Sequence, residues 1–245
     1  MLVFCMQFSS TLLHGRLVRR YKRFFADIEL SDGTLITAHC PNTGSMQGVL
    51  TPGNPVWVSQ SDDPKRKLKY TWELVEIDGT YVGVNTQNPN RIVGCALRSG
   101  YIPQLAAFTT LQAEVKYGTE NSRIDYLLTD TDGNQCYVEV KNAHYAKIEH
   151  GHRVGIFPDS ETTRGVKHLH ELMRMVDQGH RAVLIYCLQR GDCESLRFGV
   201  EFDPVYAKTA VMALNHGVEM LPYSCAITLS GITLDKPLTL SVEIE

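Results

Sequence analysis

Two carboxylates and a lysine within one predicted hairpin are the residues of this sequence best suited to chemistry. Residues 124–141 read as two strands around a polar turn near Asp132. If the turn is centred on Asp132, Asp125 faces Glu139 across the hairpin, with Cβ atoms about 4.5–5.5 Å apart. Lys141 lies two residues past Glu139 and therefore projects from the same face. This register is an assumption, because a slip of one residue would move Asp125 to the other face.

Facing carboxylates repel each other, so the hairpin needs a positive charge beside it. Carboxylate oxygens suit Mg²⁺ or Mn²⁺, and magnesium usually recruits substrate phosphates as well. We expect Asp125 and Glu139 to hold such a metal, with Glu114 as a third ligand or general base. Lys141 would orient the attacking water or stabilise the phosphate, as metal-assisted phosphodiester hydrolysis requires. The alternative is a structural ion network in which Lys141 alone neutralises the pair, and the spacing favours neither interpretation.

The elements that must position this hairpin read as an α/β domain covering residues 86–245. Apolar spacing predicts three helices, at Pro89–Arg98, Asp159–Gln178 and Val205–Asn215. The strands that accompany them are predicted at Ile124–Thr129, Cys136–Lys141, Ala182–Leu188, 218–229 and 232–244. Ala182–Leu188 is apolar throughout, as expected of a strand that is buried on both faces. The alternation of strands and helices is what indicates the α/β class.

Residues 1–85 read as all-β. Alternation runs through Arg16–Leu30, and Asp32-Gly33 is a turn signal before a partner strand. Asp78-Gly79 marks a second hairpin. Five or so short strands of this length suggest an OB-like β-barrel. The apolar opening, Met1–Phe8, is short and lacks a basic leader, so we interpret it as a first strand rather than a signal peptide.

Basic residues gather in two places in this β part. Arg16, Arg19, Arg20, Lys22 and Arg23 form the first cluster, and Lys65, Arg66, Lys67 and Lys69 form the second. Aromatic residues adjoin both, among them Tyr21 and Trp72. Lysine and arginine neutralise phosphates, and aromatic rings stack on unpaired bases, so both clusters are candidate nucleic-acid contacts. The plainer interpretation is two solvated segments beside core aromatics.

Two further segments are candidates for binding phosphate. The turn cluster Pro41–Ser45 offers the side chains of Asn42 and Ser45 together with backbone N–H groups. As an ordinary loop it would need no ligand. In the predicted helix at 159–178, Arg164 and Lys167 share one face, where they are either a solvated stripe or a phosphate clamp beside the metal.

Composition excludes several classes of protein. Of 245 residues 43% are hydrophobic, which is too many for a disordered chain. No run approaches the roughly 20 apolar residues that span a bilayer. The net charge of −3 is uneven, since residues 1–85 hold 9 basic and 8 acidic residues and residues 86–245 hold 15 and 19. This average therefore does not exclude a DNA-binding protein.

The seven cysteines are an odd number with no CxxC pair. This predicts buried free thiols and a cytoplasmic location rather than a secreted disulfide framework. His144, His150 and His152 lack the second ligand pair that structural zinc requires, so the pattern argues against zinc.

Several motifs together give a specific family resemblance. The motifs, which extend over nearly the whole chain, include Arg20–Phe24, Ala38–Met46, Pro64–Leu68, Glu114–Gly118, Ser122–Asp125, Tyr137–Asn142, Phe157–Asp159, Lys167–Leu169 and Gln189-Arg190. The chain resembles the sugar fermentation stimulation protein family, and the spacing of Asp125, Glu139 and Lys141 resembles the PD-(D/E)XK nuclease core. Ile124-Asp125 replaces the literal Pro-Asp pair of that core.

The resemblance implies an OB-type domain at residues 1–85 and a restriction-endonuclease-like domain, a mixed sheet with flanking helices, at residues 86–245. It implies that Asp125 and Glu139 are metal ligands, Lys141 is the catalytic lysine, and Gln189 is a further polar site residue. It also implies binding of single- or double-stranded DNA without strong sequence preference, and transcription regulation in sugar (maltose) metabolism. A homodimer stays open, and no membrane partner is expected.

Three functions fit these observations. The first is a DNA-binding protein that retains a metal-dependent nuclease site. The second is a DNA-binding regulator that keeps the nuclease core only as a scaffold. The third is a small-molecule phosphoesterase that uses the same metal site. The intact set of Asp125, Glu139 and Lys141 favours retained chemistry, because nothing structural demands these three residues together.

Overall fold

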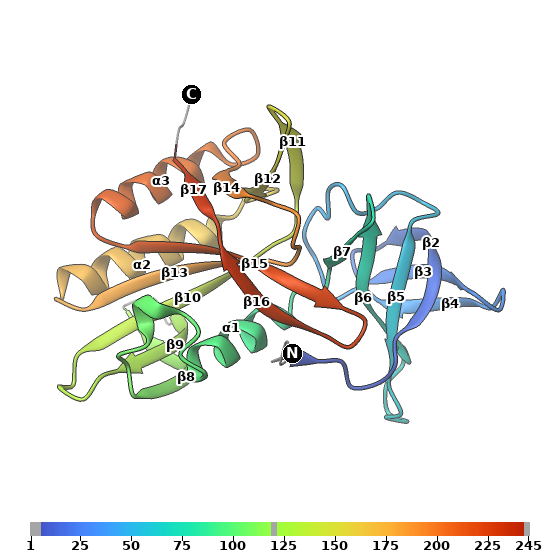
Figure 1. The fold of residues 1–245 in the computed structure, drawn as a ribbon, viewed down its shortest axis with the longest axis horizontal. Helices are drawn as coiled ribbons and strands as arrows, with labels where there is room; N and C mark the ends of the chain where they lie inside the picture. Colours follow the sequence, from blue (N-terminus) through green and yellow to red (C-terminus); the bar gives the residue numbers. More distant parts are fainter. Residues whose placement is uncertain (1–5, 119–121, 243–245) are drawn as a thin grey trace.

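The N-terminal strands close into a small barrel (Figure 1). This computed structural model describes residues 6–118 and 122–242. The barrel strands are β2 (Leu13–Tyr21), β3 (Phe25–Leu30), β4 (Leu35–His39), β5 (Pro55–Gln60) and β6 (Tyr70–Ile77), with β7 (Thr80–Gly83) paired to β6. The sheet closes because β4 also pairs with β6. Inward-facing residues such as Ile28 and Trp72 are fully buried, which confirms the predicted OB-like barrel.

The alternating stretch Arg16–Leu30 is two strands rather than one. A turn separates β2 from β3, and its residues Lys22 and Arg23 both have a left-handed backbone, with φ of 48° and 63°. Two successive positive φ values are the pattern of the type I′ turn, which matches the twist of a hairpin. Because this turn usually contains glycine or asparagine, a Lys-Arg turn gives no signal in the sequence. Both basic side chains are exposed at the hairpin tip.

The remaining chain is built around a seven-stranded mixed sheet. Its order is β1-β16-β15-β13-β10-β9-β8, made of β1 (Met6–Gln7), β8 (Thr110–Tyr117), β9 (Ser122–Thr129), β10 (Gln135–Ala143), β13 (Arg181–Leu188), β15 (Glu219–Thr228) and β16 (Gly231–Pro237). The central strands β10, β13 and β15 are parallel. The predicted opening strand thus pairs with β16 and not with the barrel, while residues 1–5 lie outside the described residues.

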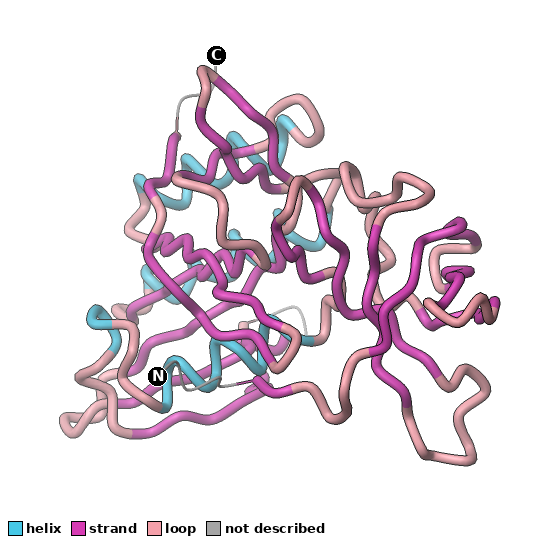
Figure 2. The backbone as a smooth tube through the Cα atoms, turned by 45° about the vertical axis from the view of Figure 1, so that its right-hand side comes forward, coloured by secondary structure: helices cyan, strands magenta, loops and turns pink. Residues whose placement is uncertain are grey.

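Helices cover both faces of this sheet (Figure 1). Helices α2 (Thr163–Asp177) and α3 (Pro204–Asn215) pack against Leu184 and Tyr186 of β13. Helix α1 (Asn88–Arg98) packs with Val183 and Ile185 on the other face. Alternate residues of β13 therefore enter two cores, which explains its apolar run. Figure 2 shows the helices confined to this α/β part, with the barrel set apart.

Helix α2 begins later than predicted, because Thr162 is its N-cap. The Thr162 hydroxyl accepts a hydrogen bond from Gly165 N at 3.0 Å. Residues 158–161 form a loop before this cap. The loop carries Asp159 toward the barrel, where Ser45 Oγ donates to Asp159 Oδ2 at 2.6 Å. A short 3₁₀ helix, η1 (Pro103–Leu105), follows α1.

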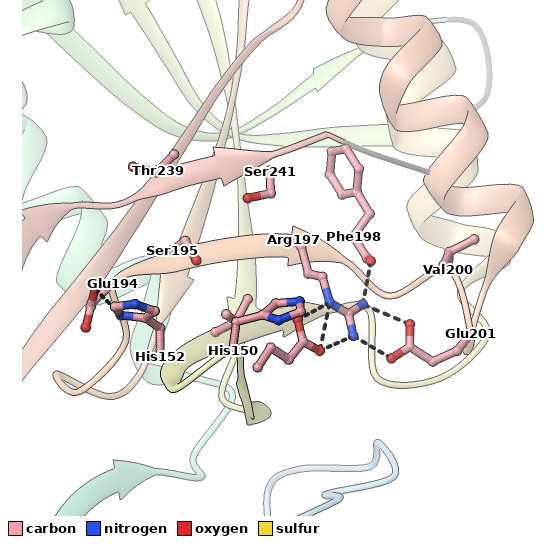
Figure 3. A pocket seen from close by; sticks show the side chains of 12 residues that line it. His150, His152, Glu194, Ser195, Arg197, Phe198, Val200, Glu201, Thr239 and Ser241 are labelled. Carbon is pink, nitrogen blue, oxygen red and sulfur yellow. Dashed lines mark hydrogen bonds and ion pairs between the residues drawn. The ribbon is translucent and has the colours of Figure 1, made fainter. Parts of the chain in front are cut away.

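The sequence did not predict a second sheet of four short strands. It is formed by β11 (Ala146–Glu149), β12 (His152–Phe157), β14 (Ser195–Phe198) and β17 (Thr239–Ser241). Charged pairs hold its outer face: Arg197 bonds Glu149 at 2.7 Å and Glu201 at 2.8 Å, and Figure 3 shows the contact with Glu201. Three of these strands have only three or four residues, which is too short for their alternation to identify them in the sequence. The predicted strand at 232–244 is divided between the two sheets as β16 and β17.

Cysteine chemistry departs in part from the expected free thiols. Cys40, Cys136, Cys187, Cys193 and Cys225 are free and buried. Cys95 is disulfide-bonded, so the expectation of free thiols is wrong there. Cys5 lies outside the described residues. None of the described helices is long and apolar enough to cross a membrane.

Helix α1 contains a glycine whose replacement tests its packing. A Cβ on Gly94 would overlap the hydroxyl of Tyr126, which donates to Asn90 O at 2.6 Å. Alanine normally stabilises a helix interior by about 1 kcal/mol relative to glycine. Here we expect Gly94→Ala to lower the free energy of unfolding by about 1–3 kcal/mol, measured in urea. The loss should shrink in a Tyr126→Phe background; a stabilised Gly94→Ala variant would contradict this packing.

Candidate functional site

The predicted register of the acidic hairpin is confirmed. Strands β9 and β10 are antiparallel, and their pairing runs from Thr129↔Gln135 to Tyr126↔Val138. The next step along this ladder brings Asp125 to the level of Glu139. The strands part at this point, and Asp125 Oδ2 accepts the hydrogen bond of Val140 N at 2.7 Å. A carboxylate thus replaces a backbone carbonyl at the end of the ladder, beside Glu139.

Glu139 is almost completely buried, at 3% exposed. Its Oε1 accepts a hydrogen bond from Lys141 Nζ at 2.8 Å and also contacts His168 Nδ1. Burial disfavours the charged carboxylate, but Lys141 and His168 outweigh burial, and the pKa of Glu139 is lowered. The second oxygen, Oε2, has no hydrogen-bond partner among the described residues. Glu139 is therefore an ionised carboxylate with one oxygen left to bind something else.

Asp125 experiences the opposite balance. Burial and the charge of Glu139 raise the pKa of its carboxyl to about 6. Hydrogen bonds from Val140 N and from Asn90 Nδ2, the latter at 2.7 Å, only partly offset this. Lys141 faces Glu139 more directly than Asp125, so one lysine does not neutralise both acids. A divalent cation between the carboxylates would remove the conflict.

His168 belongs to this site, although no pattern in the sequence assigned it a role there. Helix α2 places it at 6% exposure, and Arg164 Nε donates to its Nε2 at 3.3 Å. That bond leaves the ring proton on Nδ1, the atom that faces Glu139. Lys141 Nζ lies 3.1 Å from the same nitrogen. The spacing of Arg164 and His168, one helical turn apart, is the signal that could have found it.

A cavity of about 360 Å³ opens over Asp125. It brings together four predicted site residues and three others, and its lining is Glu114, Ser122, Arg123, Asp125, Arg164, Lys167 and His168. Glu114 lies on its exposed rim with φ of 56°. Among residues 6–118 and 122–242, no group of three or more His, Cys, Asp or Glu is close enough to hold a metal. Of the two facing carboxylates, Asp125 lines this cavity and the buried Glu139 does not.

Gln189 lies apart from this cavity, at the junction with the barrel. It follows Leu188, which pairs with Ala143, four residues beyond Glu139. Its Nε2 donates to Asn142 Oδ1 at 2.7 Å and to Asn85 O at 3.1 Å, and its carbonyl accepts from Gly83 N. In the structure Gln189 ties the linker between the two parts to the end of β10.

The predicted nucleic-acid residues of the barrel fall into two groups. The first group lies on two loops: the exposed Lys22 and Arg23 between β2 and β3, and the exposed Lys65 and Lys67 with the half-buried Arg66 between β5 and β6. These are the loops after the first and fourth barrel strands, which OB-folds use for oligonucleotides. Arg66 additionally donates to Thr71 Oγ1 at 2.9 Å.

The other predicted barrel residues have structural partners. Arg20 Nη2 donates to the carbonyls of Asn42 and Gly44, at 2.8 and 3.1 Å. Tyr21 stacks on Phe25. Ser45 bonds Asp159 across the junction, at 2.6 Å. These residues shape the loop that meets the α/β part.

Comparison with known proteins accounts for both parts of the chain. Family models described as "SfsA N-terminal OB domain" and "Sugar fermentation stimulation protein RE domain" match residues 18–84 and 87–231. The "Sugar fermentation stimulation protein homolog" of Rhodospirillum centenum is 53% identical over 96% of this chain and 100% of its own. The homolog of Maricaulis maris is 50% identical over 95% of this chain and 97% of its own.

A solved structure has the same fold. The structure of Pyrococcus furiosus SfsA in complex with Ca²⁺ aligns with a TM-score of 0.86 at 23% identity, over 98% of this chain and 100% of that one. With the OB-domain match, it confirms the predicted barrel followed by a nuclease-like mixed sheet with few helices.

The raised pKa of Asp125 predicts a pH-dependent stability change in metal-free protein. Between its ordinary value of 3.8 and about 6, the folded state binds more protons than the unfolded state, so stability from this group falls as pH rises. Asp125→Asn should therefore be more stable than wild type at pH 7.5, by about 1–3 kcal/mol, and closer to it at pH 4. Urea unfolding in EDTA measures both; a difference independent of pH would contradict the shift.

Proposed function

Because this chain belongs to the sugar fermentation stimulation protein family, we propose that it binds DNA without strong sequence preference and hydrolyses its phosphodiester bonds with Mg²⁺ or Mn²⁺. The observation that carries the proposal is the buried meeting of Asp125 and Glu139 beside Lys141. The restriction-endonuclease-like fold of the α/β part supports it, and the basic loops of the barrel supply the surface for DNA.

The donor set fits a hard divalent cation. Glu139 Oε2 has no hydrogen-bond partner within the described chain, and burial and the charge of Glu139 raise the pKa of the neighbouring Asp125. Asp125 and Glu139 would hold the ion, with water and a phosphate oxygen as its other ligands. The ion would supply Lewis-acid polarisation of the phosphate and a water of lowered pKa. The Ca²⁺ complex of the Pyrococcus furiosus protein supports a divalent cation in this fold.

The chain's own residues hold this site ready. Lys141 and His168 both bond Glu139 Oε1, which keeps the carboxylate ionised and fixes Oε2 as its open oxygen. Lys141 Nζ has further donor capacity and can stabilise charge on a phosphate. Arg164 and Glu114 line the cavity, Arg164 as a phosphate contact and Glu114 as a candidate base or water-bridged ligand at the rim.

The barrel would hold the DNA. Lys22 and Arg23 at one hairpin tip and Lys65, Arg66 and Lys67 on the loop between β5 and β6 offer positive charge without base-specific geometry. Contacts to phosphates carry no sequence information, so binding without strong preference follows.

A second candidate function is DNA binding without cleavage. It is favoured by the lack, within the described residues, of a group of three metal-binding side chains, and by the internal pairing of Glu139. In that case the nuclease fold would serve as a scaffold for a regulator. Transcription regulation in sugar (maltose) metabolism rests on the family name and would depend on this DNA binding.

Metal-dependent cleavage separates the two candidates. We expect purified protein to cut plasmid and single-stranded DNA with Mg²⁺ or Mn²⁺ but not in EDTA, as read on gels. Glu139→Ala should lower the rate at least about 100-fold, because it removes both a ligand and the partner of Lys141. The control Glu194→Ala alters an exposed carboxylate on the small sheet and should cut normally.

Two outcomes would count against cleavage by this site. A DNA shift without cleavage in any metal would leave the non-catalytic regulator. If neither shift nor cleavage appears at low salt, both candidates fail. Equal cleavage by Glu139→Ala and wild type would place any nuclease activity elsewhere.

The loop between β5 and β6 predicts a change in the salt dependence of DNA binding. Replacing Lys65, Arg66 and Lys67 by alanine should lower the slope of log affinity against log salt by about 2, since each phosphate contact contributes about 0.7–0.9. Fluorescence anisotropy in EDTA measures the slope. The matched control replaces Arg98, Lys208 and Lys236, three exposed basic residues away from this loop. Equal slopes for the two triple variants would move the binding surface elsewhere.

A further inference from the structure

A second cavity, of about 390 Å³, lies where the barrel meets the α/β part. One wall is the loop Asn42–Gly44, which follows β4 of the barrel. The opposite wall carries His144 after β10, Asp159, and Thr162 and Arg164 at the start of α2. We call this space the junction cavity. It is large enough for one nucleotide unit of a strand but too small for a duplex.

Two buried side chains of the junction cavity have nitrogen atoms without a hydrogen-bond partner in the described chain. Asn42 is 3% exposed and its Oδ1 accepts from Gly44 N at 2.9 Å, which fixes the orientation of the amide. Its Nδ2 then has no acceptor among the residues that the structure describes. His144 is 4% exposed, and its Nε2 likewise lacks a hydrogen-bond partner in the described chain. Unmatched buried donors call for a ligand that brings acceptor oxygens.

The start of α2 adds positive character to the same space. The helix has 15 residues, is capped by Thr162, and reads Thr-Arg-Gly-Val in its first turn. Free N–H groups and the helix dipole at such an end favour an anion, and Arg164 adds a full charge. Asp159 is the opposing charge, but its Oδ2 accepts from Ser45 Oγ at 2.6 Å and lies 3.9 Å from His144 Nε2. The donors therefore outnumber the acceptors.

The junction cavity lies beside the features proposed for DNA and shares a lining residue with one of them. Arg164 lines both this cavity and the one over Asp125. On the barrel side, Arg20 Nη2 donates to Arg23 O at the hairpin tip and to Asn42 O in the cavity loop, at 3.2 and 2.8 Å. Arg20 thus connects the hairpin tip to the cavity loop, and Arg164 is shared by the two cavities.

We propose that the junction cavity binds a backbone phosphate of a single DNA strand, next to the phosphate held over Asp125 and Glu139. The inference rests on the proposed function and makes it more specific, because it names an unpaired strand as the substrate. The barrel and the sheet would hold adjacent phosphates of one strand, with Asn42 and His144 donating to the outer one.

Two substitutions of opposite charge at Thr43 test this placement. Thr43 is exposed and lines the cavity, so its replacement should leave the fold intact. Affinity for a fluorescent thymidine 12-mer in EDTA should fall about tenfold in Thr43→Glu and rise several-fold in Thr43→Lys, because the site favours an anion. Thr34, exposed at the turn where β4 begins, is the control position. Thr34→Glu and Thr34→Lys should differ much less, since β4 separates them from the cavity loop by about 17 Å.

Oligomers with one neutral methylphosphonate linkage locate the phosphate. In wild type, the neutral linkage should lower affinity several-fold at one position of the oligomer. In Asn42→Asp, the neutral linkage at that position should no longer lower affinity, because the aspartate would not favour a charged phosphate there. Equal effects of the Thr43 and Thr34 pairs, or an unchanged penalty in Asn42→Asp, would overturn the junction cavity while leaving the proposed function in place. Failure of wild type to bind the 12-mer at low salt would overturn the junction cavity, and failure to bind plasmid as well would overturn both. If the Thr43 variants bind the 12-mer as wild type does and DNA is still cleaved normally, the junction cavity alone is rejected.

Discussion

The repulsion between Asp125 and Glu139 is the constraint around which the α/β part is arranged. The two carboxylates lie where β9 and β10 part, and the flanking strands are fixed by apolar cores on both faces of the sheet. The acids therefore cannot relax by moving apart. Lys141 and His168 stabilise the ionised form of Glu139. They do not do the same for Asp125, whose pKa is raised to about 6. A structural ion network would be expected to neutralise both, so the imbalance favours a site built to receive a cation.

The junction between barrel and sheet depends on the same strand. The end of β10 carries Asn142, which bonds Gln189, and the next residue after the strand is His144 of the junction cavity, while the middle of β10 carries Glu139 and Lys141. Arg164 stands between the two cavities because α2 is anchored by its Thr162 cap beside Asp159. A single strand of β-sheet thus sets the distance between a catalytic-type pocket and the surface that would hold DNA.

Much of this arrangement follows from local pattern. The hairpin register could be predicted from one turn residue, Asp132. The burial of β13 on both faces of the sheet could be predicted from its unbroken apolar run. What failed has physical reasons. The Lys22-Arg23 turn has no glycine, and three strands of the small sheet have only three or four residues, which is too short for a pattern to identify them. The part of His168 in the site, and the place of Gln189 at the junction, depend on packing between distant segments that periodicity does not encode.

The most direct test of the carboxylate pair is calorimetric titration of metal-free protein with Mn²⁺ at pH 5.5, in two buffers of different ionisation enthalpy. Because a metal binds the deprotonated carboxylate, and Asp125 has a pKa of about 6, binding should release most of one proton at pH 5.5 and little at pH 7.5. Asp125→Asn should bind more weakly and release no such proton. Absence of binding heat, or binding at pH 5.5 with no proton release, would contradict the account.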